Sequence, residues 1–153
     1  MTKMLTTLAI ALFTAAALPA QTGSAADGSA SDELIVPAEG RTLEEFRWIK
    51  RPVVVFADNP ADPRYVQQMQ YITERADALL ERDVVVITDT DPAARTAIRE
   101  ALRPREFMLV LIAKDGSRIL RKPFPWSVRE LTRSIDKLPA RQQEVRDSRM
   151  EPG

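Results

Sequence analysis

Pro52-Val-Val-Val-Phe-Ala57, continued by Asp58-Asn-Pro-Ala-Asp-Pro63, is the stretch that decides the fold. Its first half is apolar on both faces, which is typical of a central strand covered by helices on both sides. Its second half is a short loop that ends in Asp62-Pro63, an N-cap residue followed by proline at the first helical position. The stretch therefore predicts a buried strand that leads directly into a helix.

Strands and helices continue to alternate downstream. Apolar residues recur at helical spacing over Pro63–Glu81, which predicts one long helix. Asp83–Thr88 has the composition of a second buried strand, and Asp91–Leu102 begins with the same cap and proline and predicts a shorter helix. A third apolar strand covers Phe107–Ile112.

The last elements are a hairpin and a helix. Asp115-Gly116 indicates a tight hairpin, and the short, polar stretch Arg118–Arg121 after it is typical of an edge strand. Ser127 and Glu130 form a capping box that begins the last helix, with Trp126 at the staple position. The order β-α-β-α-β-β-α predicts an α/β fold, a four-stranded mixed sheet with helices on both faces. We expect the strands in the spatial order second, first, third, fourth, with the third antiparallel to the first.

The first 26 residues have the pattern of an export signal. Lys3 supplies the positive charge, Met4–Leu18 is apolar, and small residues follow at Ala20 and near Ala25. We therefore expect a signal peptide and cleavage region over 1–26 and a periplasmic or secreted product. A retained anchor is the alternative. Because the apolar run is shorter than the ~20 residues of a spanning helix, we expect no stable membrane anchor after cleavage.

Composition divides the remaining chain into three parts. Residues 27–40 are rich in small and acidic residues without a period, so we expect a flexible leader outside the packed domain. The domain spans 41–139 and opens with Thr42-Leu-Glu-Glu45, a capping box that begins a short amphipathic helix. Trp48 is a further candidate for the apolar side of that helix. Residues 140–153 form a charged tail of mixed sign.

Charge and composition exclude several classes of function. The chain has 22 basic and 22 acidic residues, and removal of residues 1–26 takes away one cation, Lys3, leaving a net charge of −1. A general nucleic-acid binder needs a basic excess, so we expect no nucleic-acid partner. Without histidine or cysteine there is no Ser-His-Asp triad, thiol nucleophile or usual zinc site. We therefore assign no catalytic, cofactor-binding or metal-binding residue.

The predicted order of elements resembles the thioredoxin core. A thioredoxin carries its C-x-x-C pair in the turn after the first strand, and an ungapped overlay of the strand ends places Pro60 and Pro63 on the two sulfur positions. Thioredoxins also have a cis-proline beside that pair. The corresponding position in this chain is near Met108, and Pro104 lies about four residues too early to replace that proline. The resemblance implies the fold, and the absence of cysteine excludes the activity for which that fold is best known.

Five stretches carry a more specific resemblance: Arg51–Ala57, Arg82–Asp89, Leu111–Gly116, Leu120–Trp126 and Ile135–Glu144. In order, over roughly 43–149, they resemble the exported thioredoxin-like domain of unknown function called P-DUDES. Small bacterial proteins contain it, and related domains occur in equarin and the sushi-repeat-containing protein. The resemblance implies a fold and an exported context. It brings no established reaction, so no site residue is carried over.

Acidic side chains follow the first two strands at the edge where open α/β sheets bind ligands. Asp58, Asn59 and Asp62 follow the first strand, and Asp89 and Asp91 follow the second. Oxygen ligands of this kind suit Ca²⁺ or Mg²⁺. Helix capping is the alternative, and it accounts for Asp62 and Asp91 without a metal.

Two arginines flank Pro104 in the loop before the third strand. Arg103 and Arg105 have two interpretations: they bind an anion, or they neutralise Asp58 and Asp62, and we favour neutralisation. We expect at least one Asp–Arg pair among these four side chains. The candidate ligand face consists of Asp58, Asn59, Asp62, Asp89, Arg103 and Arg105.

Two functions from different classes remain. The first is an exported, non-redox thioredoxin-fold module that binds an envelope protein or a small ligand. The second is an enzyme that uses carboxylates, with or without a bound divalent cation. We favour the first, because a charged rim in place of the redox pair suits recognition better than chemistry. Lys122-Pro-Phe-Pro-Trp126 adds a further candidate surface if its aromatics are exposed, whereas the staple position favours a buried Trp126.

We predict no thiol-disulfide activity, because the reaction begins with a thiolate and the chain has no cysteine. The measurement is reduction of insulin by the pure protein, with buffer alone as the blank. A rate above that blank contradicts the prediction.

Overall fold

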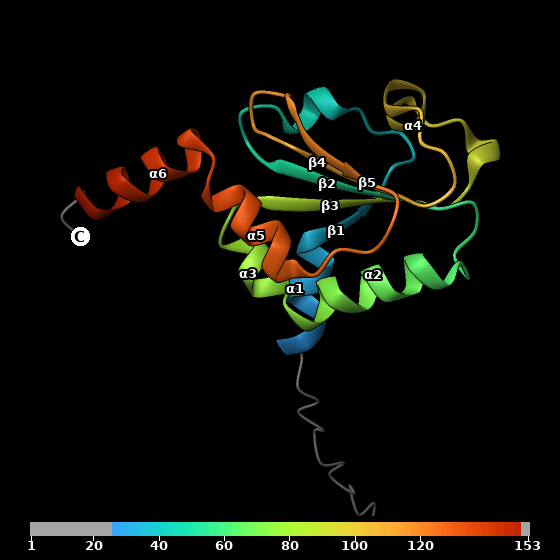
Figure 1. Cartoon of the computed structure of the whole chain (residues 1–153), viewed down its shortest axis with the longest axis horizontal. Coiled ribbons are helices and arrows are strands. Elements are labelled where there is room, and N and C mark those ends of the chain that lie inside the picture. Colours follow the sequence, from blue (N-terminus) through green and yellow to red (C-terminus); the bar gives the residue numbers. More distant parts are fainter. Residues whose placement is uncertain (1–25, 151–153) are drawn as a thin grey trace, which may run out of the picture.

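The computed structural model describes residues 26–150, so the expected signal region lies outside the described residues except for Ala26. The described chain forms one mixed sheet of five strands with helices on both faces (Figure 1). The strands lie side by side in the order β1-β3-β2-β4-β5. Their bounds are β1 Ile35–Pro37, β2 Arg51–Phe56, β3 Val84–Asp89, β4 Met108–Ile112 and β5 Arg118–Lys122.

The four strands expected from the sequence occupy the predicted order. β2 pairs in parallel with β3 and antiparallel with β4, and β4 pairs antiparallel with β5. This confirms the α/β fold with the antiparallel third strand and the terminal hairpin. The expected total of four strands is wrong, because β1 pairs in parallel with the other side of β3.

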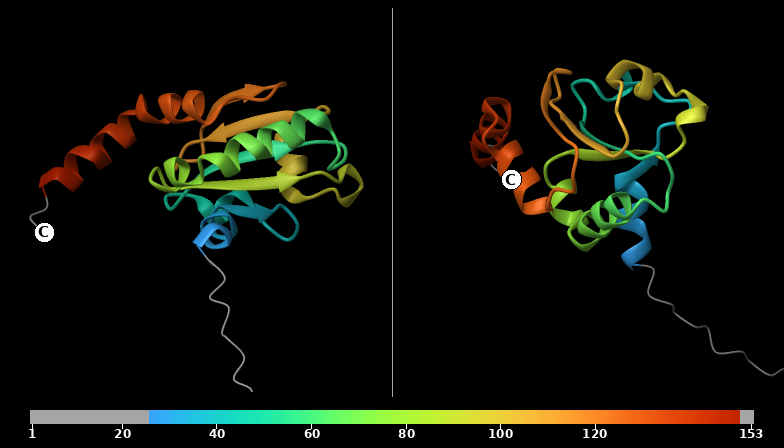
Figure 2. Two further views of the ribbon diagram at one scale, coloured as in Figure 1. Left: turned by 90° about the horizontal axis from the view of Figure 1, so that it is seen from below. Right: turned by 45° about the vertical axis from the view of Figure 1, so that its right-hand side comes forward.

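Helices cover both faces of the sheet, as predicted. Figure 1 and Figure 2 show α1, α2, α3 and α5 on one face and α4 on the other, while α6 projects past the sheet. None of the helices described is long and apolar enough to cross a membrane. Their bounds are α1 Ala26–Leu34, α2 Pro63–Glu74, α3 Ala76–Leu80, α4 Ala97–Leu102, α5 Val128–Asp136 and α6 Pro139–Met150, with the 3₁₀ turns η1 Leu43–Phe46 and η2 Pro92–Ala94.

Strand β2 lies at the centre of the core because its side chains serve both faces. Val53 and Val55 are fully buried in the cluster under α2, α3 and α5. Val54 and Phe56 are fully buried in a second cluster under η1 and α4. The apolar pattern on both faces is therefore explained by two hydrophobic layers, each stabilised by removal of apolar surface from water.

Two helices expected from the sequence, one long and one shorter, are interrupted. The predicted helix over 63–81 divides into α2 and α3 at Arg75, whose φ of −137° departs from helical geometry. The predicted helix over 91–102 divides at Arg95, which has left-handed φ, and α4 begins anew after the N-cap Thr96. Apolar spacing continues across each break, so the periodicity alone does not reveal it.

The segment 27–40 is not a flexible leader, and this expectation is corrected by the structure. Its second half forms the end of α1 and strand β1, in register with β3 from Ile35 opposite Val86. Leu34 and Ala38 are fully buried. A three-residue strand is too short to show a period, so composition suggested disorder where edge pairing creates order.

The charged tail after residue 139 is the helix α6 within the described chain. No residue of α6 is buried, which matches its charged composition. Figure 1 shows it extending away from the sheet beyond α5. Its position therefore depends on polar contacts at its first half, because it has no apolar core of its own.

We predict that Leu34→Ala lowers the free energy of unfolding by about 2–5 kcal/mol, the usual range for truncating a buried leucine. The measurement is urea denaturation of the parent and the variant. Glu33→Ala is the matched control, since Glu33 lies exposed in the same helix and is expected to leave stability almost unchanged. Equal stability of Leu34→Ala and the parent contradicts the packing of this segment.

Candidate functional site

The carboxylates expected at the ligand face serve mainly as helix caps and loop residues. Asp58 and Asn59 are exposed after β2, and Asn59 Oδ1 accepts a hydrogen bond from the Ala61 amide at 2.9 Å. Asp62 caps α2 by accepting the Arg64 amide at 2.9 Å, and the Arg64 guanidinium binds the same carboxylate. That guanidinium holds the pKa of Asp62 below its ordinary value. Hence the capping interpretation holds for Asp62.

Asp89 is the buried residue of the candidate ligand face. Its partner is Arg99, which the sequence analysis did not identify. Its carboxylate accepts the Thr96 hydroxyl at 2.6 Å and Arg99 Nη2 at 2.8 Å. Arg99 Nη2 also donates to the carbonyl of Ala57 at 3.0 Å. The pair therefore joins the carboxyl ends of β2 and β3 to α4. No local pattern in the sequence marked Arg99, because its partner lies ten residues away across a loop.

The expected ion pair between Asp58 or Asp62 and Arg103 or Arg105 does not form, so that prediction is wrong. No hydrogen bond or ion pair joins these side chains across the two loops of the described chain. The physical reason is local competition, because Asp62 is already bound by Arg64, two residues along α2. Asp58, Arg103 and Arg105 remain exposed. The structure thus brings only two members of the face, Asp62 and Asp89, into ion pairs, each with an arginine outside the set.

The remaining carboxylates do not converge on a common point. Asp91 caps η2 through the Ala93 amide at 3.0 Å. Within residues 26–150, no group of three or more Asp or Glu side chains is arranged to hold a metal ion. The carboxyl edge of the sheet is therefore a capped and internally neutralised surface.

The proline-flanked stretch after β5 also divides between core and surface. Trp126 is half-buried and packs against the main core cluster, as its staple position predicts. Its backbone amide donates to Gln68 Oε1 at 2.8 Å, while Gln68 Nε2 donates to its carbonyl at 3.0 Å. Phe124 stays 51% exposed. Trp126 is accordingly a structural anchor.

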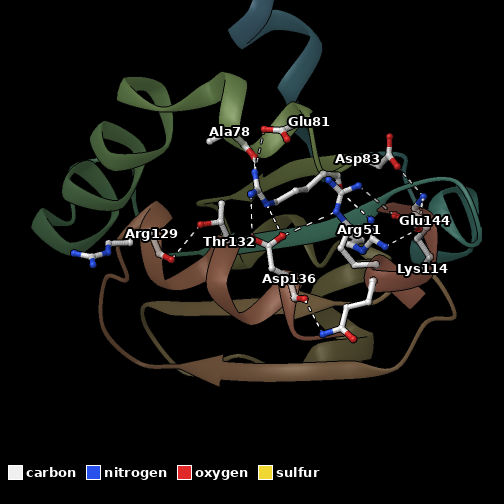
Figure 3. Close-up of polar contacts among 12 residues, drawn as sticks. Arg51, Ala78, Glu81, Asp83, Lys114, Arg129, Thr132, Asp136 and Glu144 are labelled. Carbon is white, nitrogen blue, oxygen red and sulfur yellow. Dashed lines mark hydrogen bonds and ion pairs between the residues drawn. The ribbon is translucent and has the colours of Figure 1, made fainter. Parts of the chain in front are cut away.

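The most extensive cluster of ion pairs lies at the other end of the strands from the candidate ligand face, at the start of the central strand β2. We call it the Arg51 cluster, formed by Arg51, Asp83, Lys114 and Glu144 (Figure 3). Arg51 Nη2 is 2.7 Å from Glu144 Oε1, and Lys114 Nζ is 3.0 Å from the same oxygen. Lys114 Nζ also lies 2.8 Å from Asp83 Oδ2. Four charged groups from four segments therefore meet at one point.

The charge of Arg51 needs a partner within the protein because its side chain is buried. The Arg51 side chain is only 1% exposed, and its Nη1 donates to the carbonyl of Arg82 at 2.9 Å. Among the described residues its Nε has no hydrogen-bond partner, and Glu144 is the carboxylate paired with this buried cation. Burial by itself raises the pKa of Glu144, but hydrogen bonds from Arg51 and Lys114 outweigh it and hold the pKa below the ordinary value. Because buried charges require partners, Arg51 binds α6 to the sheet.

A groove opens beside the Arg51 cluster, between α6, the β4–β5 hairpin and the segment before β2. Its volume is about 780 Å³, and Ile119 and Leu138 contribute apolar walls. Trp48 forms part of the rim, with 69% of its surface exposed. Its amide donates to the carbonyl of Lys114 at 2.7 Å, which fixes the indole beside the hairpin.

The sequence allowed Trp48 to belong to the apolar side of the short helix that begins after Thr42. The structure places Trp48 outside that helix, which ends at Phe46. It follows η1 with a left-handed φ of 67°. Bulky residues rarely adopt this conformation, and it costs on the order of 1–3 kcal/mol. The guanidinium of Arg47 lies 5.8 Å from the centre of the indole ring. Together, exposure and strain mark a surface that sequence periodicity did not reveal.

Comparison with known proteins gives one family and a fold. A family model described as "Domain of unknown function (DUF4174)" matches residues 42–144. The crystal structure of reduced Plasmodium vivax 2-Cys peroxiredoxin is 16% identical with a TM-score of 0.51, covering 68% of this chain and 84% of that one. A Plasmodium yoelii thioredoxin peroxidase I is also 16% identical, with a TM-score of 0.47 and coverage of 66% and 79%. No curated protein matches the chain.

We predict that Glu144→Gln lowers the free energy of unfolding at pH 7 by about 1.5–3 kcal/mol, the range for hydrogen bonds to charged groups. The folded-state pKa of Glu144 is lowered, so its stabilisation is present above its unfolded pKa and is lost as pH falls through the folded pKa. The difference between parent and variant is therefore expected to shrink below about pH 4. Urea denaturation at several pH values measures it.

The control for this variant is Asp147→Asn, which removes an exposed carboxylate from the same helix. We expect its stability to follow the parent at every pH. A Glu144→Gln effect that persists unchanged at pH 3 contradicts the role of the carboxylate charge.

Proposed function

Because the chain belongs to the DUF4174 family, a domain of unknown function, and has a peroxiredoxin-like fold without cysteine, we propose that it is a binding module. Thiol redox chemistry is absent from it. The proposed binding site is the groove between α6, the β4–β5 hairpin and Trp48. Its occupant is a partner segment that carries a lysine or arginine among aliphatic residues.

The observation that carries the proposal is the exposed Trp48 on a strained backbone. A tryptophan with 69% of its surface in water forgoes the stabilisation of burial. A φ of 67° adds local strain, which persists in proteins where the surroundings hold it and clusters at functional sites. Tryptophan is also among the side chains that most often dominate binding interfaces. Groove, exposure and strain coincide at this residue.

Charge complementarity supports a basic occupant. Asp115 and Asp147 are exposed carboxylates at the lining of the groove. Lys114 and Arg51 already contact Glu144, so their charges are compensated within the protein. The Arg47 guanidinium near the indole illustrates that this ring accepts a cation at its face. An incoming basic side chain meets an aromatic ring and an excess of carboxylates.

The alternative, an enzyme that uses carboxylates with or without a divalent cation, has less support. Its candidate groups after β2 and β3 are capped, paired with arginine or separated from one another. General acid–base chemistry requires a carboxyl group with free access to a substrate proton. Asp89, the most buried of them, is bound on both oxygens by Thr96 and Arg99.

Export belongs to the same proposal. Its support is the pattern of Lys3, the apolar run Met4–Leu18 and the small residue Ala20, together with the resemblance to the exported P-DUDES domain. We propose that the mature chain acts in the periplasm or outside the cell, without a stable membrane anchor. Its partner there is an envelope protein with a basic and apolar segment, and the near-neutral charge argues against nucleic acid.

We predict that short peptides alternating arginine with leucine bind the groove and that Trp48→Ala weakens this binding at least tenfold, about 1.4 kcal/mol. The measurement is a titration followed by isothermal calorimetry at moderate salt. Peptides in which glutamate replaces arginine are expected not to bind.

Phe124→Ala provides the matched control, because Phe124 is an exposed aromatic outside the groove. It is expected to keep the parent affinity. Two results overturn the site: equal affinity of the Trp48→Ala variant and the parent, or equal binding of the acidic and basic peptides.

A further inference from the structure

A second recess lies on the other flank of α6 and is lined by arginines. We call it the arginine cleft, with a volume of about 440 Å³. Arg82 enters it from the turn before β3, and the other three arginines belong to α6. Its charged lining consists of Arg82, Arg141, Arg146 and Arg149 with two carboxylates, Glu81 and Asp136. Four guanidinium groups therefore face two counter-charges.

Arg82 is fully engaged with the protein. Its Nε and Nη2 bind the two oxygens of Asp136 at 2.8 and 3.0 Å, and its Nη1 donates to the carbonyl of Ala78 at 2.8 Å (Figure 3). This bidentate geometry is the strong form of an arginine–carboxylate pair. Asp136 is thus largely neutralised by Arg82 and contributes little to the rest of the cleft.

Arg141 is the poorly matched member. Its side chain is only 13% exposed, yet its nearest carboxylate contacts are 3.4 Å to Glu144 and 4.0 Å to Asp136. Among the described residues its buried Nε has no hydrogen-bond partner and is closed to a ligand. A phosphate in the cleft therefore contacts Arg141 through the part of its side chain that lines the recess, where the long carboxylate contacts leave the guanidinium charge poorly compensated.

The outer arginines have no acidic partner in the part of the chain that the structure describes. Arg146 donates to the neutral side-chain oxygen of Gln143 at 2.8 Å, and Arg149 has no hydrogen bond or ion pair within the described residues. Both lie on one face of α6, three residues apart, where like charges repel each other. A bound anion removes this repulsion and supplies the missing counter-charge.

We propose that the arginine cleft binds a phosphate group. A guanidinium offers paired N–H donors whose geometry matches phosphate oxygens, and a doubly charged anion balances the excess of two cations. The site does not overlap the groove beside Trp48, since the two share none of the residues that line them. It therefore stands independently of the function proposed above. Inorganic phosphate, a soluble phosphoester and a lipid headgroup share this chemistry.

The first test uses pyrophosphate as the probe, because it carries the same group at higher charge. The melting temperature of the full chain is measured against pyrophosphate at constant ionic strength, with sodium chloride as the balance. A specific ligand raises the melting temperature in proportion to the logarithm of its concentration. We expect a rise with pyrophosphate and a smaller rise with phosphate. No rise, or an equal rise with chloride, overturns the proposal.

Variants locate the site. Arg149→Gln changes an exposed side chain and is expected to weaken pyrophosphate binding at least fivefold, and Arg141→Gln at least tenfold. Arg105→Gln is the control, because it removes the same charge from an exposed position at the opposite edge of the sheet. It is expected to keep the parent response. If Arg141→Gln proves too unstable, Arg149→Gln alone decides, and a parent-like response from it overturns the assignment.

A flotation assay separates the sources of the phosphate. Vesicles of phosphatidylcholine with or without phosphatidic acid are mixed with the parent chain and the Arg149→Gln variant. Binding to phosphatidic acid that the variant reduces and pyrophosphate displaces assigns a lipid headgroup. A pyrophosphate response in solution without such vesicle binding assigns a soluble phosphate compound. Vesicle binding that is the same for parent and variant, with no pyrophosphate response, overturns the site.

Discussion

The need to pair a buried cation at the start of the central strand determines how the last helix, α6, is attached to the sheet. Arg51 is 1% exposed in β2, and a lone charge at such a position is strongly unfavourable. Glu144 supplies the counter-charge from α6, and the carbonyl of Arg82 accepts a further donor. Since α6 has no buried residue, this polar contact holds the helix against the sheet. The Arg51 cluster therefore holds α6 to the sheet by polar contacts, whereas apolar packing holds the other helices.

Both proposed recognition surfaces follow from that attachment. The groove beside Trp48 and the arginine cleft are lined by residues on opposite faces of α6, so both depend on the position of this helix against the domain. The carboxyl edge, where thioredoxin-fold proteins hold their redox pair, is different. There Asp89 and Arg99 close the ends of β2 and β3. The groove and the arginine cleft thus lie away from the carboxyl edge of the sheet, where the resemblance to thioredoxins predicted the functional site.

The predictions that held were those in which a local pattern has one physical meaning. An apolar stretch such as Val53–Ala57 must be covered on both faces, and Asp115-Gly116 lies in the turn of the β4–β5 hairpin. Those that failed required knowledge of neighbours distant in the sequence. The segment 27–40 gains order from pairing with β3, and the expected pair of Asp62 with Arg103 or Arg105 is replaced by the contact of Asp62 with Arg64, which lies closer in the chain.

Local patterns were sufficient to predict the order of four of the five strands, the absence of thiol chemistry and the capping role of Asp62, because strand period, residue content and cap geometry are local properties. Which charges meet depends on tertiary packing. Arg51 and Glu144 are separated by 93 positions, and their contact at 2.7 Å depends on the packing of α5 that brings α6 to the sheet. The same packing places Trp48 beside a groove and four arginines around a cleft. Long-range ion pairs leave no period in a sequence, so the structure alone reveals where this chain has surfaces suited to binding.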